Sequence, residues 1–187
     1  MPLYQNTSVD TTKLILGNYK IEVALTTEAG TYINLGAGIV NSFGHNITKY
    51  TSQAGNAPDP LEGIATETFV VSANLIEYDA SALNVIQAGA LTYATGTTGV
   101  TVLSGGGNQT LTPKIFRLTN RRLINGVTDE TVILVYNATM DTGVQFTAKS
   151  DNDADPINVL ACNITAKPDA TRTAGSQLFK ITHTYNP

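Results

Sequence analysis

The chain has 187 residues, of which 42% are hydrophobic and 14% charged, and its formal net charge is -4. This length suits a single domain with a core of its own, and the negative charge excludes a general attraction for nucleic-acid phosphates. A lone cysteine, Cys162, excludes an intrachain disulfide, and no apolar stretch is long enough to cross a membrane. The first residues lack the basic start and apolar run of a secretory signal, so we expect a protein made in a cytoplasm.

Strand patterns dominate the first forty residues. Two apolar runs flank Gly17 and Asn18, a pair suited to a tight turn, and Ile33 and Leu35 alternate with polar neighbours soon after. From 41 to 63 the pattern fails, because this segment is polar and has two prolines near its end. It is predicted as one long loop, and a loop of that size in a compact domain is usually functional or orders on binding.

The stretch FVVSANLIEYDASALNVIQAG combines a strand with a short helix. Its first half, with the residues just before it, alternates between an apolar face and a mixed face of small and apolar residues, which are Thr68, Val70, Ser72, Asn74 and Ile76. Asp79 is suited to cap a helix over about residues 80-88 by accepting from the free amides of the first turn. So short a helix is unstable alone, so we expect it to lie against a sheet.

Strand patterns return in the second half of the chain. A short strand is predicted around Val100–Leu103, and Phe116 and Leu118 alternate with polar residues in the next. Two final strands are predicted within 157–169 and 176–185. One further strand is predicted to present on a single face the residues Val132, Leu134, Tyr136, Ala138 and Met140. The sequence therefore predicts one mainly β domain over 1–187, an antiparallel β-sandwich or barrel with one short flanking α-helix.

No motif marks an active site. Three alternating aspartates resemble the start of a calcium loop, but a proline stands where that loop needs glycine, and Cys162 stands where it needs glutamate. A solvated turn is the favoured interpretation for these residues, which are Asp151, Asp153 and Asp155. His45 and His183 have no third metal ligand in register, although a nucleophile–His–acid set assembled in space stays open. We therefore predict a protein that is not an enzyme and needs no cofactor.

Three segments together resemble the major tail tube proteins of long-tailed bacteriophages: Phe69–Gly89, Asn120–Asp151 and Ile157–Thr182. The similarity lies in the order of strands and helix, the chain length and the long polar segment in the first third. It implies hexameric rings that stack into the tube guiding DNA from capsid to host. The implied partners are other copies of the chain, a tape measure protein, a tail terminator and baseplate proteins, and the implied location is the virion tail.

The resemblance also implies roles for single residues. In that family the corresponding loop bridges adjacent rings, which assigns ring stacking to Thr48, Tyr50 and Asn56. The lumen is expected to be acidic or neutral, so that DNA slides through without binding. Glu67 and Glu77 are the candidates for its charge, although they lie on the same strand face as the apolar residues.

Other interpretations stay open at this stage. The acidic residues could instead form ion pairs between subunits with Arg117, Arg121 or Arg122. A carbohydrate-binding or adhesion sandwich suits the threonine- and asparagine-rich composition, but tryptophan is absent. A monomeric sandwich, a small β-barrel hydrolase, and another virion or secretion-tube component are the remaining alternatives.

Overall fold

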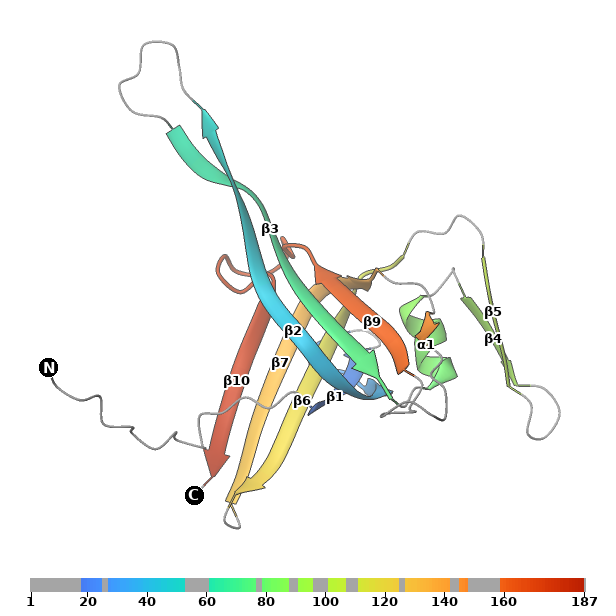
Figure 1. The fold of residues 1–187 in the computed structure, drawn as a ribbon. Helices are drawn as coiled ribbons and strands as arrows, with labels where there is room; N and C mark the ends of the chain where they lie inside the picture. The colour runs from blue at the N-terminus through green and yellow to red at the C-terminus, as the bar shows by residue number, and fades with distance from the viewer. Residues whose placement is uncertain are drawn as a thin grey trace, which may run out of the picture.

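The structure is a computed structural model that describes residues 18–24, 27–52, 61–76, 79–87, 91–95, 101–106, 111–124, 127–141, 145–147 and 159–186. The predictions for Gly17, Asn56, Glu77 and the three aspartates of 151–155 lie outside these residues. The elements in chain order are β1 (Asn18–Ala24), β2 (Tyr32–Ser52), β3 (Leu61–Leu75), α1 (Ala80–Ile86), β4 (Leu91–Thr95), β5 (Thr101–Gly105), β6 (Lys114–Ile124), β7 (Val127–Met140), β8 (Phe146–Thr147), β9 (Val159–Ala166) and β10 (Phe179–Asn186) (Figure 1).

Eight of the strands form one antiparallel sheet in the order β10-β7-β6-β1-β2-β3-β9-β8. A further pairing of β7 with β9 joins the two sides of this sheet. Six strands, β7, β6, β1, β2, β3 and β9, therefore close into a barrel, which leaves β10 and β8 at the sheet edges. The prediction of a mainly β, antiparallel sandwich or barrel with one short helix is confirmed.

A bulge in β7 makes the closure possible. Before it, residues up to Val135 pair with β10, and from Ala138 onward the strand pairs with β9 instead. Asn137 lies between them in a left-handed conformation (φ 45), and its side-chain amide donates to the carbonyl oxygens of Lys167 and Pro168, both at 3.2 Å. β7 thus has a different neighbour on this edge at each end.

The same bulge corrects the prediction that five residues of this strand share one face. Ala138 and Met140 do point into the core, but the buried residues before the bulge are Ile133 and Val135, while Val132 and Leu134 lie on the other face. Tyr136 is buried directly after Val135, on the outer face. An inserted residue inverts the alternation of a strand, and a period of two read along the sequence cannot detect it.

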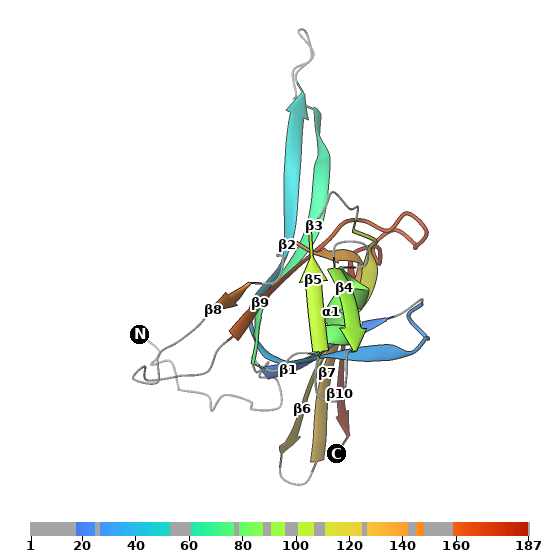
Figure 2. The same ribbon diagram turned by 90° about the vertical axis from the view of Figure 1, so that its right-hand side faces the viewer.

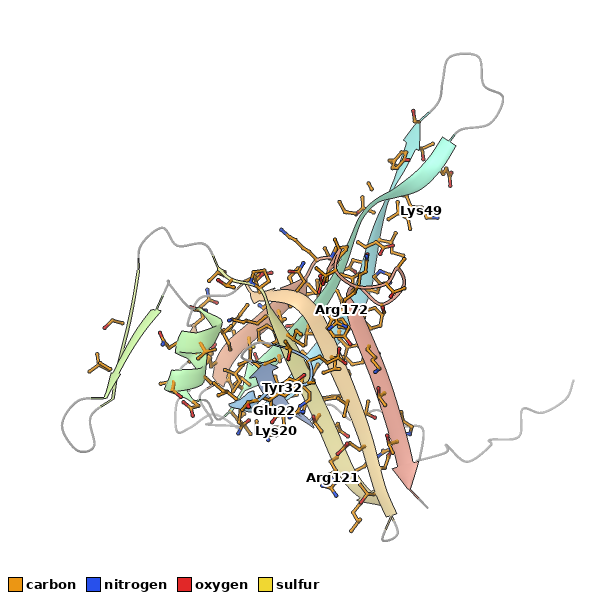
Figure 3. The ribbon with its side chains drawn as sticks, turned by 180° about the vertical axis from the view of Figure 1, so that it is seen from behind. Lys20, Glu22, Tyr32, Lys49, Arg121 and Arg172 are labelled. Atoms are coloured by element: carbon orange, nitrogen blue, oxygen red, sulfur yellow. The ribbon has the colours of Figure 1, made fainter. Side chains whose placement is uncertain are left out.

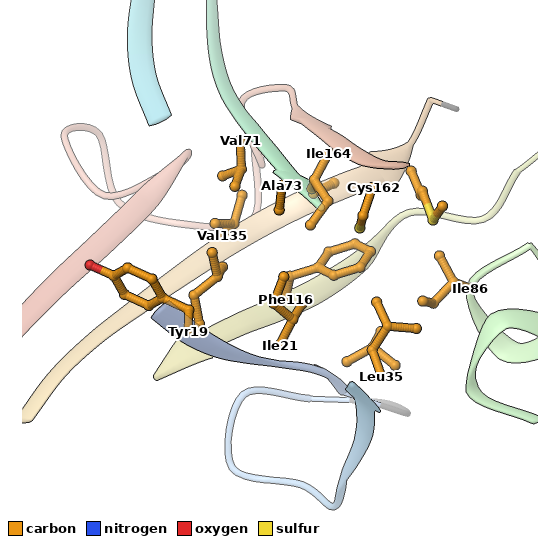
Figure 4. Packing of buried hydrophobic residues seen from close by; sticks show 14 of the residues in the cluster. Tyr19, Ile21, Leu35, Val71, Ala73, Ile86, Phe116, Val135, Cys162 and Ile164 are labelled. Carbon is orange, nitrogen blue, oxygen red and sulfur yellow. The ribbon is translucent and has the colours of Figure 1, made fainter. Parts of the chain in front are cut away.

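The core fills the barrel with the inward residues of its six strands, β1, β2, β3, β6, β7 and β9. Phe69, Val71, Ala73 and Leu75 are buried, as the alternation of β3 predicts, and so are Phe116 and Leu118 of β6. Figure 4 shows side chains from β1, β3, β6, β7 and β9 meeting in one cluster. Burial raises the pKa of the Cys162 thiol in this cluster to about 12, so the thiol is unreactive at neutral pH.

Helix α1 forms where the sequence predicts it. The carboxylate of Asp79 accepts from the backbone amides of Ser81 (2.7 Å) and Ala82 (3.4 Å), which is the expected N-cap. Leu83 and Ile86 are buried in the core cluster, and Figure 4 shows Ile86 close to Leu35 of β2. The helix also contacts the separate β4–β5 hairpin, which lies on the same side of the molecule (Figure 2). Within the described residues, no helix has the length and hydropathy needed to cross a membrane.

The predicted loop over 41–63 is wrong for residues 41–52 and 61–63, which are strand, and residues 53–60 lie outside the described residues. β2 runs for 21 residues to Ser52, and it pairs with β3 in register from Gly38↔Leu75 to Ser52↔Leu61. β9 pairs with β3 only from Phe69 onward, so residues 45–52 and 61–68 leave the barrel as a two-stranded ribbon, here called the arm (Figure 1). Bulges after Val40 and after Thr48 interrupt the alternation, and the residues are mostly polar, which hides the strand in the sequence.

A second extension leaves the barrel in the opposite direction. β1 covers β6 only up to Thr119, so 120–124 of β6 continue beyond the barrel with 127–131 of β7 and 183–186 of β10. These three strand ends are here called the blade. Figures 1 and 2 show the arm and the blade pointing away from the barrel at opposite ends.

Candidate assembly surfaces

The arm exposes apolar side chains on both of its faces. Ile47 and Ile64 lie on the face that continues the barrel interior, and 48% and 54% of their surfaces are exposed. Tyr50 lies on the other face, where its ring covers Gly63 so closely that an added Cβ would come within 2.6 Å of it. The predicted stacking residues Thr48 and Tyr50 are both exposed on this arm. Their role in ring stacking stays a prediction.

An aromatic cluster anchors the base of the arm. The rings of Phe69 and Phe179 stack with their centroids 4.3 Å apart. The centroid of Phe43 lies 6.3 Å from that of Phe69, and the His45 ring meets Phe179 edge-on with a centroid distance of 5.8 Å. Glu67 reaches His45 with a closest N–O distance of 3.8 Å. A pocket of about 340 Å³ opens beside these residues. The candidate lumen carboxylate Glu67 is therefore half-buried at the arm base, on the core face as predicted, with a histidine beside it.

The small polar face of β3 is on the outside of the barrel. Thr68, Ser72 and Asn74 are half-buried there, opposite the core, which confirms the predicted alternation. Their cross-strand partners on β2 and β9 include Asn46 and Asn163, which are also uncharged. Val70 and the exposed Ile76 share this face, so it is uncharged and mixed rather than wholly polar.

A groove of about 830 Å³ lies on the outer face of the sheet. It crosses the neighbouring strands β2, β1, β6 and β7 in that order. Its exposed apolar residues are Ile39 and Ile76, with 48% and 47% of their surfaces exposed. Its charged residues are Lys20, Glu22, Arg117, Arg121 and Glu130. The groove thus combines an apolar floor with charges of both signs.

Most of the groove's charge is paired within the chain. Glu22, which is 6% exposed, accepts from Nε of Arg117 at 2.8 Å and contacts Lys20 Nζ at 2.8 Å. Burial raises the pKa of the Glu22 carboxyl, but the hydrogen bonds from Arg117 and Lys20 outweigh it and hold that pKa below its usual range. The Arg117 guanidinium also stacks over the Tyr32 ring at 3.8 Å. Arg117, a candidate for an ion pair between subunits, therefore has its carboxylate partner within its own chain.

Arg121 differs from the other two candidate arginines. It is exposed at the groove, and it has no ion pair with any residue that the structure describes. Arg122, by contrast, points to the other face of the blade and donates through Nε to the buried carboxylate of Asp129. Arg121 is thus the candidate that keeps its charge available to a partner.

The blade contains a histidine set that sequence inspection left open. His183 Nδ1 lies 3.0 Å from Thr131 Oγ1, and His183 Nε2 lies 3.4 Å from Asp129 Oδ1. This resembles the order of a hydroxyl–His–acid set, but Thr131 is only 6% exposed and Asp129 is bound to Arg122. The Thr131 hydroxyl is too buried for a substrate to reach it, so these contacts hold β7 and β10 together in the blade. The set could have been found only from the register that places His183 opposite Thr131.

A braced loop over 167–178, which sequence inspection missed, covers the bulge in β7. Arg172 stacks over the Tyr136 ring at 3.4 Å, pairs with Glu28 at 2.9 Å and contacts Asp169 at 3.4 Å. Thr171 donates to Asp169, which lowers the pKa of that carboxyl. The loop borders the arm base at both ends, because residues 167–168 and 175–178 line pockets beside it. It therefore fixes the region from which the arm emerges.

No family model and no curated protein matches this sequence. Among the described residues, no group of three or more His, Cys, Asp or Glu side chains could hold a metal ion. The surfaces that remain as candidates for function are therefore the arm, the groove, the blade and the uncharged outer face of β3.

Proposed function

We propose that the protein is a structural subunit of a phage tail tube, in which hexameric rings stack and DNA passes through the lumen. The observation that carries this proposal is the arm. The ring number, the virion location and the tape measure, terminator and baseplate partners come from the resemblance of the sequence to tail tube proteins. The architecture supports the more general part of the proposal, which is assembly with copies of itself.

The arm supports self-assembly because it is poorly suited to an isolated subunit. A two-stranded ribbon has no core of its own and is only marginally stable in water. This one exposes Ile47, Tyr50 and Ile64 at three places along its length, and unpaired strand edges favour contacts with another chain. A neighbouring subunit that covers the arm would bury these side chains and hold the ribbon in place.

The directions of the arm and the blade support a stack rather than a closed pair. They leave the barrel at opposite ends (Figures 1 and 2), so a contact between the arm of one copy and the far end of another repeats along one axis. Such head-to-tail contacts generate open-ended polymers. Neighbours within a ring would then pack side by side around the barrels.

The uncharged outer face of β3 supports a passage for DNA. Thr68, Ser72 and Asn74 hold water and carry no positive charge, so a wall built from them would not retain phosphates. Glu67 remains the described candidate for added negative charge. The lumen of this proposal is therefore acidic or neutral, and wet.

Electron microscopy of the concentrated, purified protein tests the proposal directly. Rings or tubes of uniform diameter are expected, with sedimentation showing a concentration-dependent shift from small species to large ones. Side chains facing the lumen can then be assigned from a map of the tube. A protein that stays monomeric at all concentrations, or a lumen lined by lysine and arginine, contradicts the proposal.

A further inference from the structure

We infer that the arm of one copy docks in the groove of another copy, with Glu62 of the arm against Arg121 of the groove. This inference rests on the proposed self-assembly and names the two surfaces that meet. Ile64 is expected to enter the groove beside Glu62 and to lie against Val132, which also lines it.

The groove has the chemistry of a receptor for an apolar and acidic segment. Ile39 and Ile76 form an exposed apolar floor. Three cations line the groove against two carboxylates, and Glu22 is already held by Lys20 and Arg117. Arg121, opposite Glu130 on the neighbouring strand, has no ion pair with a described residue. A guanidinium beside apolar surface favours a carboxylate that arrives with an apolar neighbour.

The arm carries that combination. Glu62 and Ile64 are two residues apart in β3, so their side chains share a face of the ribbon at a spacing of about 7 Å. Both are exposed, and Glu62 has no ion pair with a described residue. In the groove, Arg121 of β6 lies diagonally across from Val132 of β7. Diagonal neighbours on adjacent strands are about 7–8 Å apart. The acidic–apolar pair of the arm therefore matches the basic–apolar pair of the groove.

The placement of the two surfaces requires a second copy. Figure 3 shows Lys49 on the arm and Arg121 near the tip of β6 at opposite ends of the molecule, so a subunit's arm points away from its own groove. The contact is heterologous, because one copy supplies the arm and the other the groove. Each docked subunit still presents a free groove or a free arm, and growth continues in one direction.

Charge reversal tests the pairing. Glu62→Lys alone and Arg121→Glu alone each place like charges together, and each should raise the protein concentration needed for assembly by about tenfold or more. The double variant with both reversals restores an opposite pair and should recover most of the assembly. Lys180→Glu, an exposed reversal on β10 without a described ion pair, is the matched control and should assemble like the parent chain. Circular dichroism on every variant checks that the barrel is folded.

Disulfide trapping tests the same contact without relying on tubes. Cys162 is buried and unreactive, so the single variants Glu62→Cys and Arg121→Cys each have one reactive thiol, the one that was introduced. A one-to-one mixture under mild oxidation should give a mixed dimer far more readily than either variant alone. Thr48→Cys, on the opposite face of the arm, replaces Glu62→Cys in the control mixture and should cross-link weakly.

The outcomes separate this inference from the proposed function. Mixed cross-links without any rings or tubes would support the arm–groove contact and overturn the tail tube proposal. Tubes that form without the mixed cross-link, and that tolerate both single reversals like the control, would overturn the contact and leave the tube proposal standing. Sensitivity to Arg121→Glu with none to Glu62→Lys would show that the groove receives a different segment.

Discussion

At the scale of single residues, two arginines hold aromatic rings and carboxylates together on the outside of the barrel. Arg117 links Glu22 to the Tyr32 ring, and Arg172 links Glu28 to the Tyr136 ring. Arginine suits this role because its planar guanidinium can stack on a ring and donate hydrogen bonds at the same time. These side chains stabilise the subunit, which leaves Arg121 as the arginine suited to contacts between subunits.

Glu22→Gln is expected to weaken the fold and to remove part of its sensitivity to acid. The folded-state pKa of Glu22 is depressed, so its contribution to stability is complete above the unfolded-state pKa of about 4.3 and is lost as the pH falls through the lower folded-state value. At pH 7 the substitution should lower the free energy of unfolding by about 1–3 kcal/mol, because a charge-assisted hydrogen bond is lost. Urea unfolding of both proteins at pH 7 and pH 3.5 measures this. Equal losses on acidification in parent and variant would contradict the assignment.

Asp129→Asn is expected to destabilise the blade strongly. The buried carboxylate neutralises Arg122 and lies beside His183, so an amide leaves the guanidinium buried without its counter-charge. Breaking one partner of a buried pair costs about 3–5 kcal/mol. Thermal and urea unfolding measure the loss, with the exposed Asp141→Asn as the control. A stability equal to that of the control would show that the pair is worth little.

The same set of residues should show no catalysis. Thr131 is buried beneath the blade's strands, so its hydroxyl cannot meet an ester or amide substrate despite its contact with His183. Hydrolysis of a panel of ester and peptide substrates should not exceed the uncatalysed rate. A rate that is measurable and disappears in His183→Ala would overturn the structural assignment of this set.

At the scale of elements, local patterns were predicted well and pairings between distant segments were not. The alternation of β3 and β6 and the cap at Asp79 depend on neighbouring residues, and each is confirmed. The arm was missed because two bulges and a polar composition hide its period. The face of Val132 and Leu134 was wrong because the bulge at Asn137 arises where β7 changes partners, from β10 to β9. The groove could not be predicted at all, since its strands come from both halves of the chain.

Two glycines of β2 are expected to respond in opposite ways to alanine. A Cβ at Gly38 would lie 2.7 Å from the carbonyl oxygen of Asn74, so Gly38→Ala must push β2 away from β3. A Cβ at Gly44 meets nothing within 4 Å, and there the substitution should be neutral or slightly stabilising. We expect Gly38→Ala to lower the free energy of unfolding by about 1–3 kcal/mol. The two variants differ only in position, so equal stabilities would contradict the close approach.

At the scale of the whole molecule, the barrel contains the hydrophobic core and the arm is a two-stranded extension outside it. The closed core and the braced 167–178 loop do not include any residue of the arm's outer half. In the proposed assembly, folding of the subunit and burial of the arm are therefore separate steps, and the second depends on protein concentration.

A chain in which residues 46–68 are replaced by Asn-Gly should fold but not assemble. His45 and Phe69 are cross-strand partners, so a two-residue turn can join them while the barrel keeps its pairing. Thermal unfolding should stay cooperative, and sedimentation should show monomers at concentrations where the parent chain forms large species. A triple serine variant of Ile47, Tyr50 and Ile64 keeps the ribbon and tests whether its apolar side chains are the cause. Tubes from the shortened chain would exclude the arm from assembly.

The strand order also determines which pairings can form first while the chain is being synthesised. β1 is made first but pairs with β6, whose first residue is Lys114, and the barrel closes only when β9 ends at Ala166. Pairings this distant in sequence fold slowly compared with local ones. The arm, by contrast, is a local hairpin that is complete once Leu75 has been made. In a chain still on the ribosome, the residues of the arm are therefore complete before those of the groove, whose last lining residue is Val132. A chain that stops before β7 would have the residues of the arm but neither the closed barrel nor the complete groove, so under the proposed contact it could not receive the arm of another copy.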